Sequence, residues 1–130
     1  AVNVASTSVA DTGLTVNITP TATTSKVLVQ VNQSILTDID TTGGNSKIKL
    51  LRGSTTVIDF TTNIARVEAG GASSAKFGNL TTFSFLDSPS TTSETTYKTQ
   101  GAISSTSNNG TARFQNSSVP SVITVTEILA

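Results

Sequence analysis

Histidine and cysteine are absent from this chain of 130 residues, and so are methionine and tryptophan. Without histidine and cysteine, Ser-His-Asp and Cys-His catalysis are excluded, as are disulfides and metal sites built on imidazole or thiolate ligands. Only carboxylate chemistry and oxygen-ligated metals stay open. The lack of methionine indicates that the initiator has been removed or that the chain is a processed piece.

Charge is also scarce, because only 12% of the residues are charged and eight Lys and Arg balance eight Asp and Glu. Nucleic-acid-binding proteins normally carry a basic excess along one face, so nucleic acid is not an expected partner. The longest apolar-rich stretch, residues 27–39, is interrupted by polar residues, and membrane insertion is not expected either. Residues 1–10 lack the basic start and apolar block of a signal peptide.

The chain is instead rich in hydroxyl residues, since Ser and Thr make up about a third of it. Thr favours strands, whereas Ser and Gly favour turns. A mucin-like stalk is the alternative for such a composition. Proline occurs only three times, however, and the apolar residues form clusters of strand length, so a folded domain is the better interpretation. At this length we expect a single domain, residues 1–130.

Alternating apolar and polar residues predict a succession of short strands separated by turns. No helical pattern lies between them, so the sheets must be largely antiparallel. We predict an all-β fold, an antiparallel and jelly-roll-like β-sandwich of about eight to nine strands. The predicted strands are residues 14–19, 26–33 (continued past a bend by 34–40), 47–52 and 55–61 as a hairpin, 80–86, 94–103, 112–115 and 122–128.

The remaining segments are predicted as loops or ends. Residues 40–46, 69–75 and 104–110 are polar or small and are predicted as loops, each either plainly solvated or part of a recognition surface. Residues 1–10 precede the first clear strand pattern, and an extended N-terminal arm is one interpretation of them. With five Phe, one Tyr and no Trp, the core of a monomer is small, so we expect further burial between copies. The candidate subunit-contact residues are Phe77, Phe83, Phe85 and Phe114.

Oxygen ligands for a metal occur in one loose pattern, Asp38 and Asp40 followed by Gly43, Gly44 and Asn45. A calcium loop of the EF-hand type needs a third ligand next in line and a Glu farther on. Thr42 is a weak substitute for the third ligand, and Lys49, near the Glu position, has the wrong charge. We therefore interpret the two aspartates as solvent-facing carboxylates at a strand end and expect no metal and no cofactor.

A carboxylate pair for glycoside hydrolysis is the other catalytic option. Several of the acids lie in predicted turns, where Asp caps backbone amides, and no Trp is present as a sugar platform. We therefore expect no enzyme activity and no catalytic residue. The acids are Asp11, Asp38, Asp40, Asp59, Glu68, Asp87, Glu94 and Glu127, and chance Asn-X-Ser/Thr sequences occur at Asn17, Asn32, Asn79, Asn109 and Asn116.

Five segments, taken together and in order, resemble a family of small phage proteins that are common in marine and cyanobacterial tailed phages. Members are usually labelled tail-fibre-like or uncharacterised virion proteins. No single motif is specific, but the five occur in the right order, and the resemblance extends over nearly the whole chain. They are Thr12–Pro20, Ser25–Asn32, Lys49–Ser54, Leu86–Pro89 with Thr95–Gln100, and Thr124–Ile128.

This resemblance implies a β-sandwich that assembles, as a homotrimer, on the exterior of the virion, with no catalytic residues to carry over. Partners would be copies of itself and other virion proteins of the capsid or tail. Many relatives end a longer fibre, whereas almost nothing precedes Thr12 here, so a capsid decoration subunit is an alternative to a fibre tip or knob. A carbohydrate-binding adhesion module that recognises host surface glycans is the alternative from another functional class.

Overall fold

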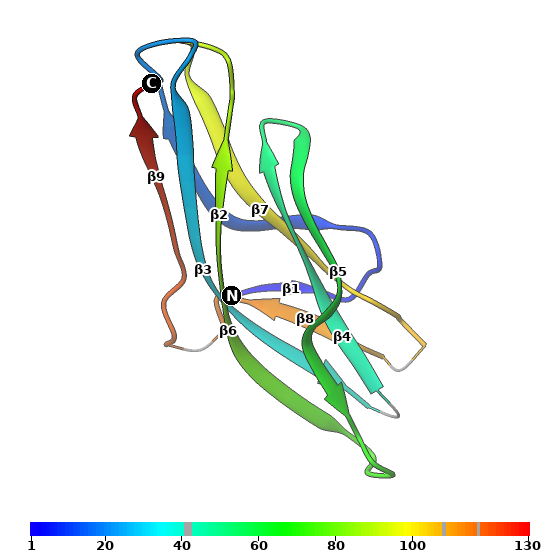
Figure 1. Ribbon diagram of the computed structural model, residues 1–130. Helices are drawn as coiled ribbons and strands as arrows, with labels where there is room; N and C mark the ends of the chain where they lie inside the picture. The colour runs from blue at the N-terminus through cyan, green and yellow to red at the C-terminus, as the bar shows by residue number, and fades with distance from the viewer. Residues whose placement is uncertain (41–42, 108, 117) are drawn as a thin grey trace.

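The computed structural model describes residues 1–40, 43–107, 109–116 and 118–130, without the side chains of residues 61–63. These residues form nine strands in two antiparallel sheets that pack face to face (Figure 1). The predicted all-β, antiparallel β-sandwich is therefore confirmed.

The first sheet has five strands, with the long strand β3 at its centre. Along one edge, β3 pairs with β6 over its full length. Its other edge is shared, because β9 pairs with residues 26–32 and β8 pairs with residues 35–38. The strands are β1 (Val2–Val4), which pairs with β8, β3 (Lys26–Ile39), β6 (Ala75–Asp87), β8 (Thr111–Phe114) and β9 (Val122–Ile128).

The second sheet has the order β2-β7-β4-β5. The predicted hairpin is present between β4 and β5, where Arg52 pairs with Thr55 across a two-residue loop. Gly53 opens that loop with a φ of 57°, a left-handed conformation that glycine adopts without a steric penalty. The strands are β2 (Ala10–Ile18), β4 (Gly43–Arg52), β5 (Thr55–Glu68) and β7 (Thr95–Ile103).

Several boundaries differ from the prediction because neighbouring strands supply hydrogen bonds that a local pattern does not reveal. Residues 43–46, predicted as loop, begin β4, while residues 41–42 lie outside the described residues. β5 continues to Glu68, which pairs with Gly43. β6 already begins at Ala75, which pairs with Ile39. Residues 34–39 continue β3 without a break. Residues 1–10 are not a free arm, because they contain β1 and the buried Val4.

The core lies between the sheets and is layered along β3. Three valines at the start of β3 pack with Leu50 and Tyr97. Farther along, Ile35 packs with the Phe114 cluster, and Ile39 belongs to a third cluster at the far end. Buried polar residues separate these apolar layers. The inward residues of β3 are Val27, Val29, Val31, Gln33, Ile35, Thr37 and Ile39.

Candidate functional site

The aspartates considered for metal binding are engaged by other side chains. Asp38 Oδ2 accepts a hydrogen bond from Arg113 Nη2 at 2.6 Å and lies 3.3 Å from Lys76 Nζ. Asp40 Oδ2 accepts one from Asn109 Nδ2 at 3.1 Å. Among the residues that the structure describes, no three acidic side chains converge as a metal-binding group. This geometry suits carboxylates that form local ion pairs and hydrogen bonds at a strand end.

Two groups of buried hydroxyls join the sheets in the polar layers of the core. In one, Thr99 Oγ1 donates to Gln33 Oε1 at 2.7 Å and lies 2.6 Å from Thr12 Oγ1. In the other, Thr37 Oγ1 donates to the Ala65 carbonyl at 2.5 Å and lies 2.7 Å from Ser46 Oγ. Buried polar groups are costly when they are unpaired. A shift of one sheet over the other would break both groups, so they fix the relative position of the sheets.

A third polar group closes one end of the sandwich around Tyr97, which is fully buried on β7. Tyr97 Oη donates to Asp87 Oδ2 at 2.6 Å. Arg52 Nη1 donates to both carboxylate oxygens of Asp87, at 2.7 and 2.8 Å. Burial, followed by the hydrogen bond to the Asp87 carboxylate, raises the pKa of Tyr97 well above its ordinary value of 10.0. The three residues come from β4, β6 and β7 and so connect the two sheets.

Tyr97 is the only tyrosine in the chain, so its ionisation can be followed directly by ultraviolet absorbance. The pKa of Tyr97 is higher in the folded than in the unfolded state. Tyr97 therefore contributes fully to stability at pH values below its unfolded-state pKa, and this contribution is lost as the pH rises toward the folded-state pKa. Above about pH 10, the free energy of unfolding should fall by up to about 1.4 kcal/mol per pH unit. We expect tyrosinate to form only as the protein unfolds, and we expect Tyr97→Phe to remove the alkaline slope. Reversible ionisation near pH 10 with native circular dichroism would contradict this.

The four phenylalanines predicted as subunit contacts occupy three kinds of position. Phe114 is fully buried in the core of the monomer and offers no surface to another copy. Phe83 and Phe85 are half-buried on the inward side of β6, where the Phe83 ring meets Phe60 edge to face at a centroid distance of 5.0 Å. Phe77, near the start of β6, is 43% exposed. Of the four, Phe77 keeps the largest surface for contact with another molecule.

A different apolar surface lies on the outward side of the first sheet. Residues directly opposite each other on paired strands share one face, so the register assigns the outward side chains of β3, β6 and β9 to a common surface. We call it the β3–β6–β9 face. Five of its large aliphatic side chains, including one from the β8–β9 connection, are 42–50% exposed. They are Leu80, Leu86, Val119, Val122 and Ile128.

The β3–β6–β9 face has an apolar row near each end and polar rows between them. One apolar row pairs Leu28 with Leu86, and the other lies around Leu36 and Leu80. Between them, a shallow hollow of about 370 Å³ is lined mainly by amides and hydroxyls, namely Gln30, Asn32, Thr82, Ser84 and Thr124. Thr82 Oγ1 donates to Asn32 Oδ1 at 3.1 Å within this polar part.

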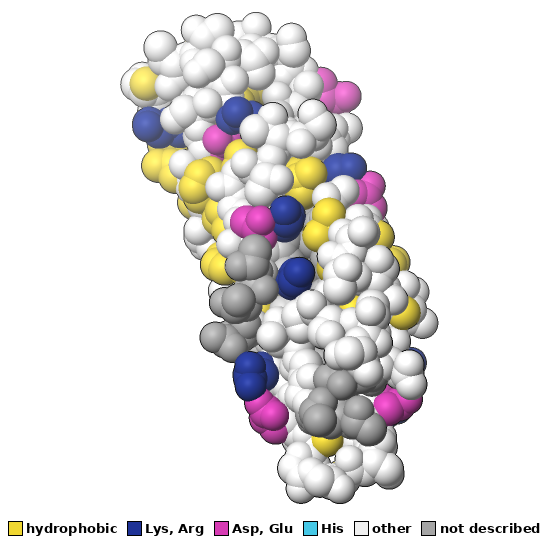
Figure 2. Space-filling view, turned by 90° about the vertical axis from the view of Figure 1, so that its right-hand side faces the viewer, with side chains coloured by type: hydrophobic (Ala, Val, Ile, Leu, Met, Phe, Trp, Pro, Cys, Tyr) yellow, Lys and Arg dark blue, Asp and Glu magenta, His cyan; other side chains and the backbone are white. Residues whose placement is uncertain are grey.

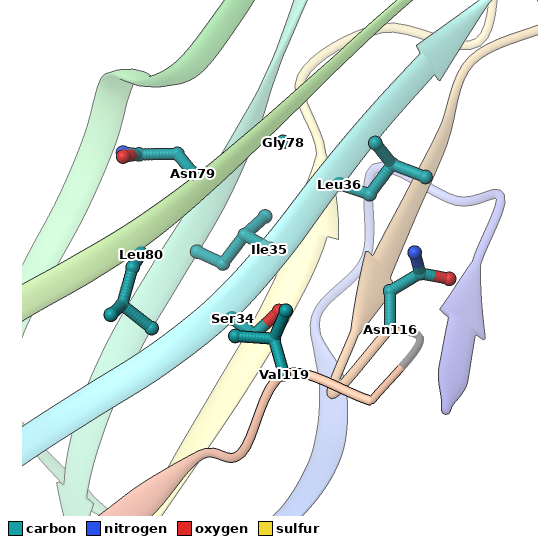
Figure 3. A pocket seen from close by; sticks show the side chains of 8 residues that line it. All are labelled: Ser34, Ile35, Leu36, Gly78, Asn79, Leu80, Asn116 and Val119. Atoms are coloured by element: carbon teal, nitrogen blue, oxygen red, sulfur yellow. The ribbon is translucent and has the colours of Figure 1, made fainter.

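A second hollow of about 320 Å³ forms where the β8–β9 connection leaves the sheet. At this point Ser34 N donates to Ser121 Oγ at 2.9 Å, and Gln115 N donates to the Ser34 carbonyl at 3.1 Å. Figure 3 shows side chains from β3, β6 and the connection around the hollow, with Asn79 directed away from the others. We call this hollow the β8–β9 groove; its lining residues are Ser34, Ile35, Leu36, Gly78, Asn79, Leu80, Asn116 and Val119.

Charged side chains are absent from the middle of the β3–β6–β9 face. Along β3 its outward positions from Leu28 to Ser34 are uncharged, as are their partners on β6 and β9, whereas Leu36 pairs with the charged Arg113 of β8. Elsewhere several charged residues form opposite-sign pairs, such as Lys49 with Asp59 and Lys98 with Asp11. On the side drawn in Figure 2, most dark blue side chains lie near magenta ones, and most of the surface is white, the colour of the backbone and of side chains that are neither hydrophobic nor charged.

The predicted loops gather toward one end of the sandwich (Figure 1). Ser104 N donates to the Asn45 carbonyl at 2.8 Å, and Asn45 N donates to Ser104 Oγ at 3.2 Å, which ties the β7–β8 loop to the start of β4. The β5–β6 loop at residues 69–74 lies at the same end. This end presents small polar residues and no exposed aromatic ring from these loops.

Four exposed residues of this face were not predicted from the sequence as contact residues, namely Leu80, Leu86, Val119 and Val122. The sequence did indicate two of them, because Leu80 and Leu86 lie at the alternate positions of β6, on the side of the strand opposite to Phe83 and Phe85. An aliphatic residue on the otherwise polar phase of a strand indicates a second contact surface.

Comparisons with known proteins assign no relative. No family model, curated protein or solved structure matches the chain. In the described residues, no helical segment has the length and hydrophobicity needed to cross a bilayer.

Proposed function

We propose that this chain is a non-enzymatic structural subunit of a phage particle, carried on the exterior of the virion. Copies of it assemble with one another, as a trimeric fibre tip or knob or as a capsid decoration subunit. The observation that carries the proposal is the partly apolar β3–β6–β9 face, whose middle rows are uncharged. The resemblance of the five segments to phage virion proteins supports the location.

Strand order supports a jelly-roll connectivity, a finer classification than β-sandwich. With β8 and β9 taken as two parts of one last strand, the sheets have the orders 1-8-3-6 and 2-7-4-5. We take these orders as those of a jelly roll. Jelly rolls occur in viral capsid proteins and in lectins. The fold is therefore compatible with both candidate functions, and the surface chemistry has to separate them.

Self-association fits the surface chemistry of the β3–β6–β9 face. Interface centres are depleted in charge and enriched in apolar side chains, and large exposed apolar patches mark interaction sites. Leu80 and Leu86 are 47% and 50% exposed on this face, whereas Phe83 and Phe85 on the inward side of the same strand are half-buried against the core. Covering these leucines stabilises an assembly of a chain whose monomer core is small.

Glycan binding is the second candidate, favoured by the amides and hydroxyls that line the polar hollow, such as Gln30, Asn32 and Thr82. Sugar sites usually add an aromatic platform. Here Phe83 and Phe85 face inward, and Tyr97 is buried. A glycan array separates the candidates, because selective binding by a stable monomer would support the adhesion module and contradict the structural subunit.

Replacing Leu86 by Asp should disrupt the assembly, because a carboxylate would be buried in one of the two apolar rows of the contact. We expect the Kd for self-association to rise by at least about 30-fold, which corresponds to about 2 kcal/mol. Light scattering and sedimentation measure the mass. Thr56→Asp is the matched control, since Thr56 is exposed on β5 of the other sheet. A wild-type chain that stays monomeric, or equal effects of the two substitutions, would contradict the proposed assembly.

The location has a test of its own. Density for this chain on the outside of an imaged particle is the expected result, on the shell for a decoration subunit and on the tail for a fibre tip. Absence of the chain from purified particles would contradict the virion part of the proposal.

A further inference from the structure

The outer edge of β6 is a long strand edge that pairs with no other strand in the described part of the chain. On its inner edge, β6 pairs with β3 in continuous register over all 13 of its residues, without a bulge. An edge strand leaves the N–H and C=O groups of alternate residues without a partner strand, so it is a template for the addition of a further strand.

The other strand edges of the sandwich are interrupted or short. β2 shifts register with β7 between Asp11 and Thr15, where Gly13 has a φ of 86°. β5 shifts register with β4 at three places, and Ala65 at one of them has a φ of 47°. The far edge of the first sheet is divided between the short strands β1 and β9. Bulges and short strands prevent edge-to-edge association, and β6 has neither feature.

Charge and proline, which also protect strand edges, are missing from most of β6. Residues 77–86 contain no charged residue and no proline, and the charged residues Lys76 and Asp87 lie near the two ends of the strand. Leu80 and Leu86 are exposed within this segment. The open edge of β6 is therefore long, uncharged and partly apolar.

The sequence of β6 also matches itself when a second copy runs antiparallel beside it. In an edge-to-edge pair with a two-fold axis perpendicular to the sheet, residues opposite each other lie on the same side of the sheet. Leu80 lies opposite Leu86 of the second copy when the axis passes beside Phe83. The same register places Thr82 opposite Ser84 and the two Phe83 residues opposite each other. Aliphatic, hydroxyl and aromatic residues thus each meet their own kind, as in stable cross-strand pairs.

We propose that two copies of the chain pair edge to edge through antiparallel β6 strands, with Phe83 at the two-fold axis, so that their first sheets form one continuous sheet. Backbone hydrogen bonds then join residues 79–87 of the two copies. The inference rests on the self-assembly in the proposed function but not on the virion location. The β3–β6–β9 faces of the two copies lie side by side as one larger surface, which stays open for the further contacts of a trimer.

A second copy suits this edge better than an unrelated strand. Any extended peptide can add to a sheet edge through its backbone, but side chains decide which one fits. The two-fold axis repeats the match of Leu80 with Leu86, so a second copy covers the exposed leucines of both chains. One strand pair covers less surface than a standard interface. Self-assembly offsets this, because it holds neighbouring copies at a high local concentration.

A parallel pairing of the two β6 edges is less favourable. It would turn one copy over relative to the other, so that the outward side of one first sheet continues into the inward side of the next. Leu80 and Leu86 of the two copies would then lie on opposite sides of the joined sheet and could not contact each other.

Absence of cysteine from the chain permits a clean cross-linking test. Thr82→Cys and Ser84→Cys variants, both altered at exposed positions, are purified separately, distinguished by a tag, mixed and oxidised. We expect the mixed disulfide to form at least about tenfold faster than in the control pair, because directly opposite residues bring their thiols together. The control pair is Thr82→Cys with Asn17→Cys, since Asn17 is exposed on β2 of the other sheet. Circular dichroism of each variant verifies folding.

Backbone amide exchange distinguishes the edge contact from packing of the β3–β6–β9 faces. In the edge pair, alternate amides of residues 79–87 gain hydrogen bonds. We expect their exchange to be at least about tenfold slower in the assembled wild-type chain than in the diluted one. Packing through the face alone leaves this edge in water, and its amides continue to exchange fast. NMR measures the exchange residue by residue, with the open edge of β2 as the control.

The outcomes separate this inference from the proposed function. Fast Thr82–Ser84 cross-linking together with slowed β6 amides supports the edge pair. A wild-type chain that assembles to at least twice the 13.3 kDa of one chain, but cross-links no faster than the control or keeps fast β6 amides, overturns the pairing and leaves self-assembly standing. A chain that is monomeric at every concentration overturns both.

Discussion

Replacing Gly101 by Ala is expected to lower the free energy of unfolding by about 3 kcal/mol, toward the upper end of the usual cost of overpacking. A Cβ at this position would lie within 2.6 Å of three atoms of the Phe114 ring, Cζ, Cε1 and Cε2. Phe114 is fully buried and packs with Ile35 and Ile103, so a shift of its ring would disturb the packing of this core cluster. Chemical denaturation followed by circular dichroism measures the loss.

Two further variants test this explanation. Gly78→Ala is the matched control, because a Cβ there meets only Leu36 Cδ1 at 3.7 Å, an ordinary contact. Its effect should be small. Phe114→Leu in the Gly101→Ala background should recover part of the loss, since the smaller side chain relieves the overlap. Equal destabilisation by both alanine substitutions, or no recovery in the double variant, would show that the close approach of Gly101 to Phe114 is not the cause.

Replacing Asp87 by Ala is expected to lower the free energy of unfolding by about 3–5 kcal/mol, the usual cost of removing one partner of a buried ion pair. The substitution leaves the fully buried Tyr97 hydroxyl without its acceptor and the Arg52 guanidinium without its carboxylate. It also disconnects β6 from β4 and β7 at one end of the sandwich. Thermal and chemical denaturation measure the change.

Asp59→Ala is the matched control for this effect. Asp59 pairs with Lys49 at 2.9 Å, but both side chains are partly exposed, and such a pair contributes less than about 1 kcal/mol. Tyr97→Phe should cost less than Asp87→Ala, because Arg52 keeps its partner. Similar losses for Asp87→Ala and Asp59→Ala would contradict a structural role for the buried cluster.

The fold was predictable where strands alternate cleanly between apolar and polar residues. Residues 122–128 were predicted as a strand and are β9, and the β4–β5 hairpin was predicted at the correct loop. The end of β5 and the start of β6 were missed, because residues 66–79 consist largely of small and polar residues. Their strand structure depends on partners that are distant in sequence, such as Gly43 for Glu68 and Ile39 for Ala75.

The candidate site was harder to predict, for a related reason. Alternation shows which residues share one side of a strand, but not what lies opposite that side. Phe114 was predicted as a subunit contact, yet Gly101 on the other sheet leaves the space that its ring fills in the monomer core. Leu80 and Leu86 carried a usable signal as aliphatic residues on the polar phase of β6. Val119 carried none, since its position depends on the path of the β8–β9 connection.

The shared edge of β3 also has a consequence for biosynthesis. β9 closes the edge along residues 26–32, and the pair Lys26–Ile128 joins positions that are far apart in the sequence. A ribosome-bound chain cannot complete this pairing until Ile128 has emerged. Contacts of such large sequence separation form slowly, and open strand edges are prone to association. The unfinished chain therefore exposes the edge that β9 later covers, so its aggregation during synthesis should be most sensitive to the C-terminal strand.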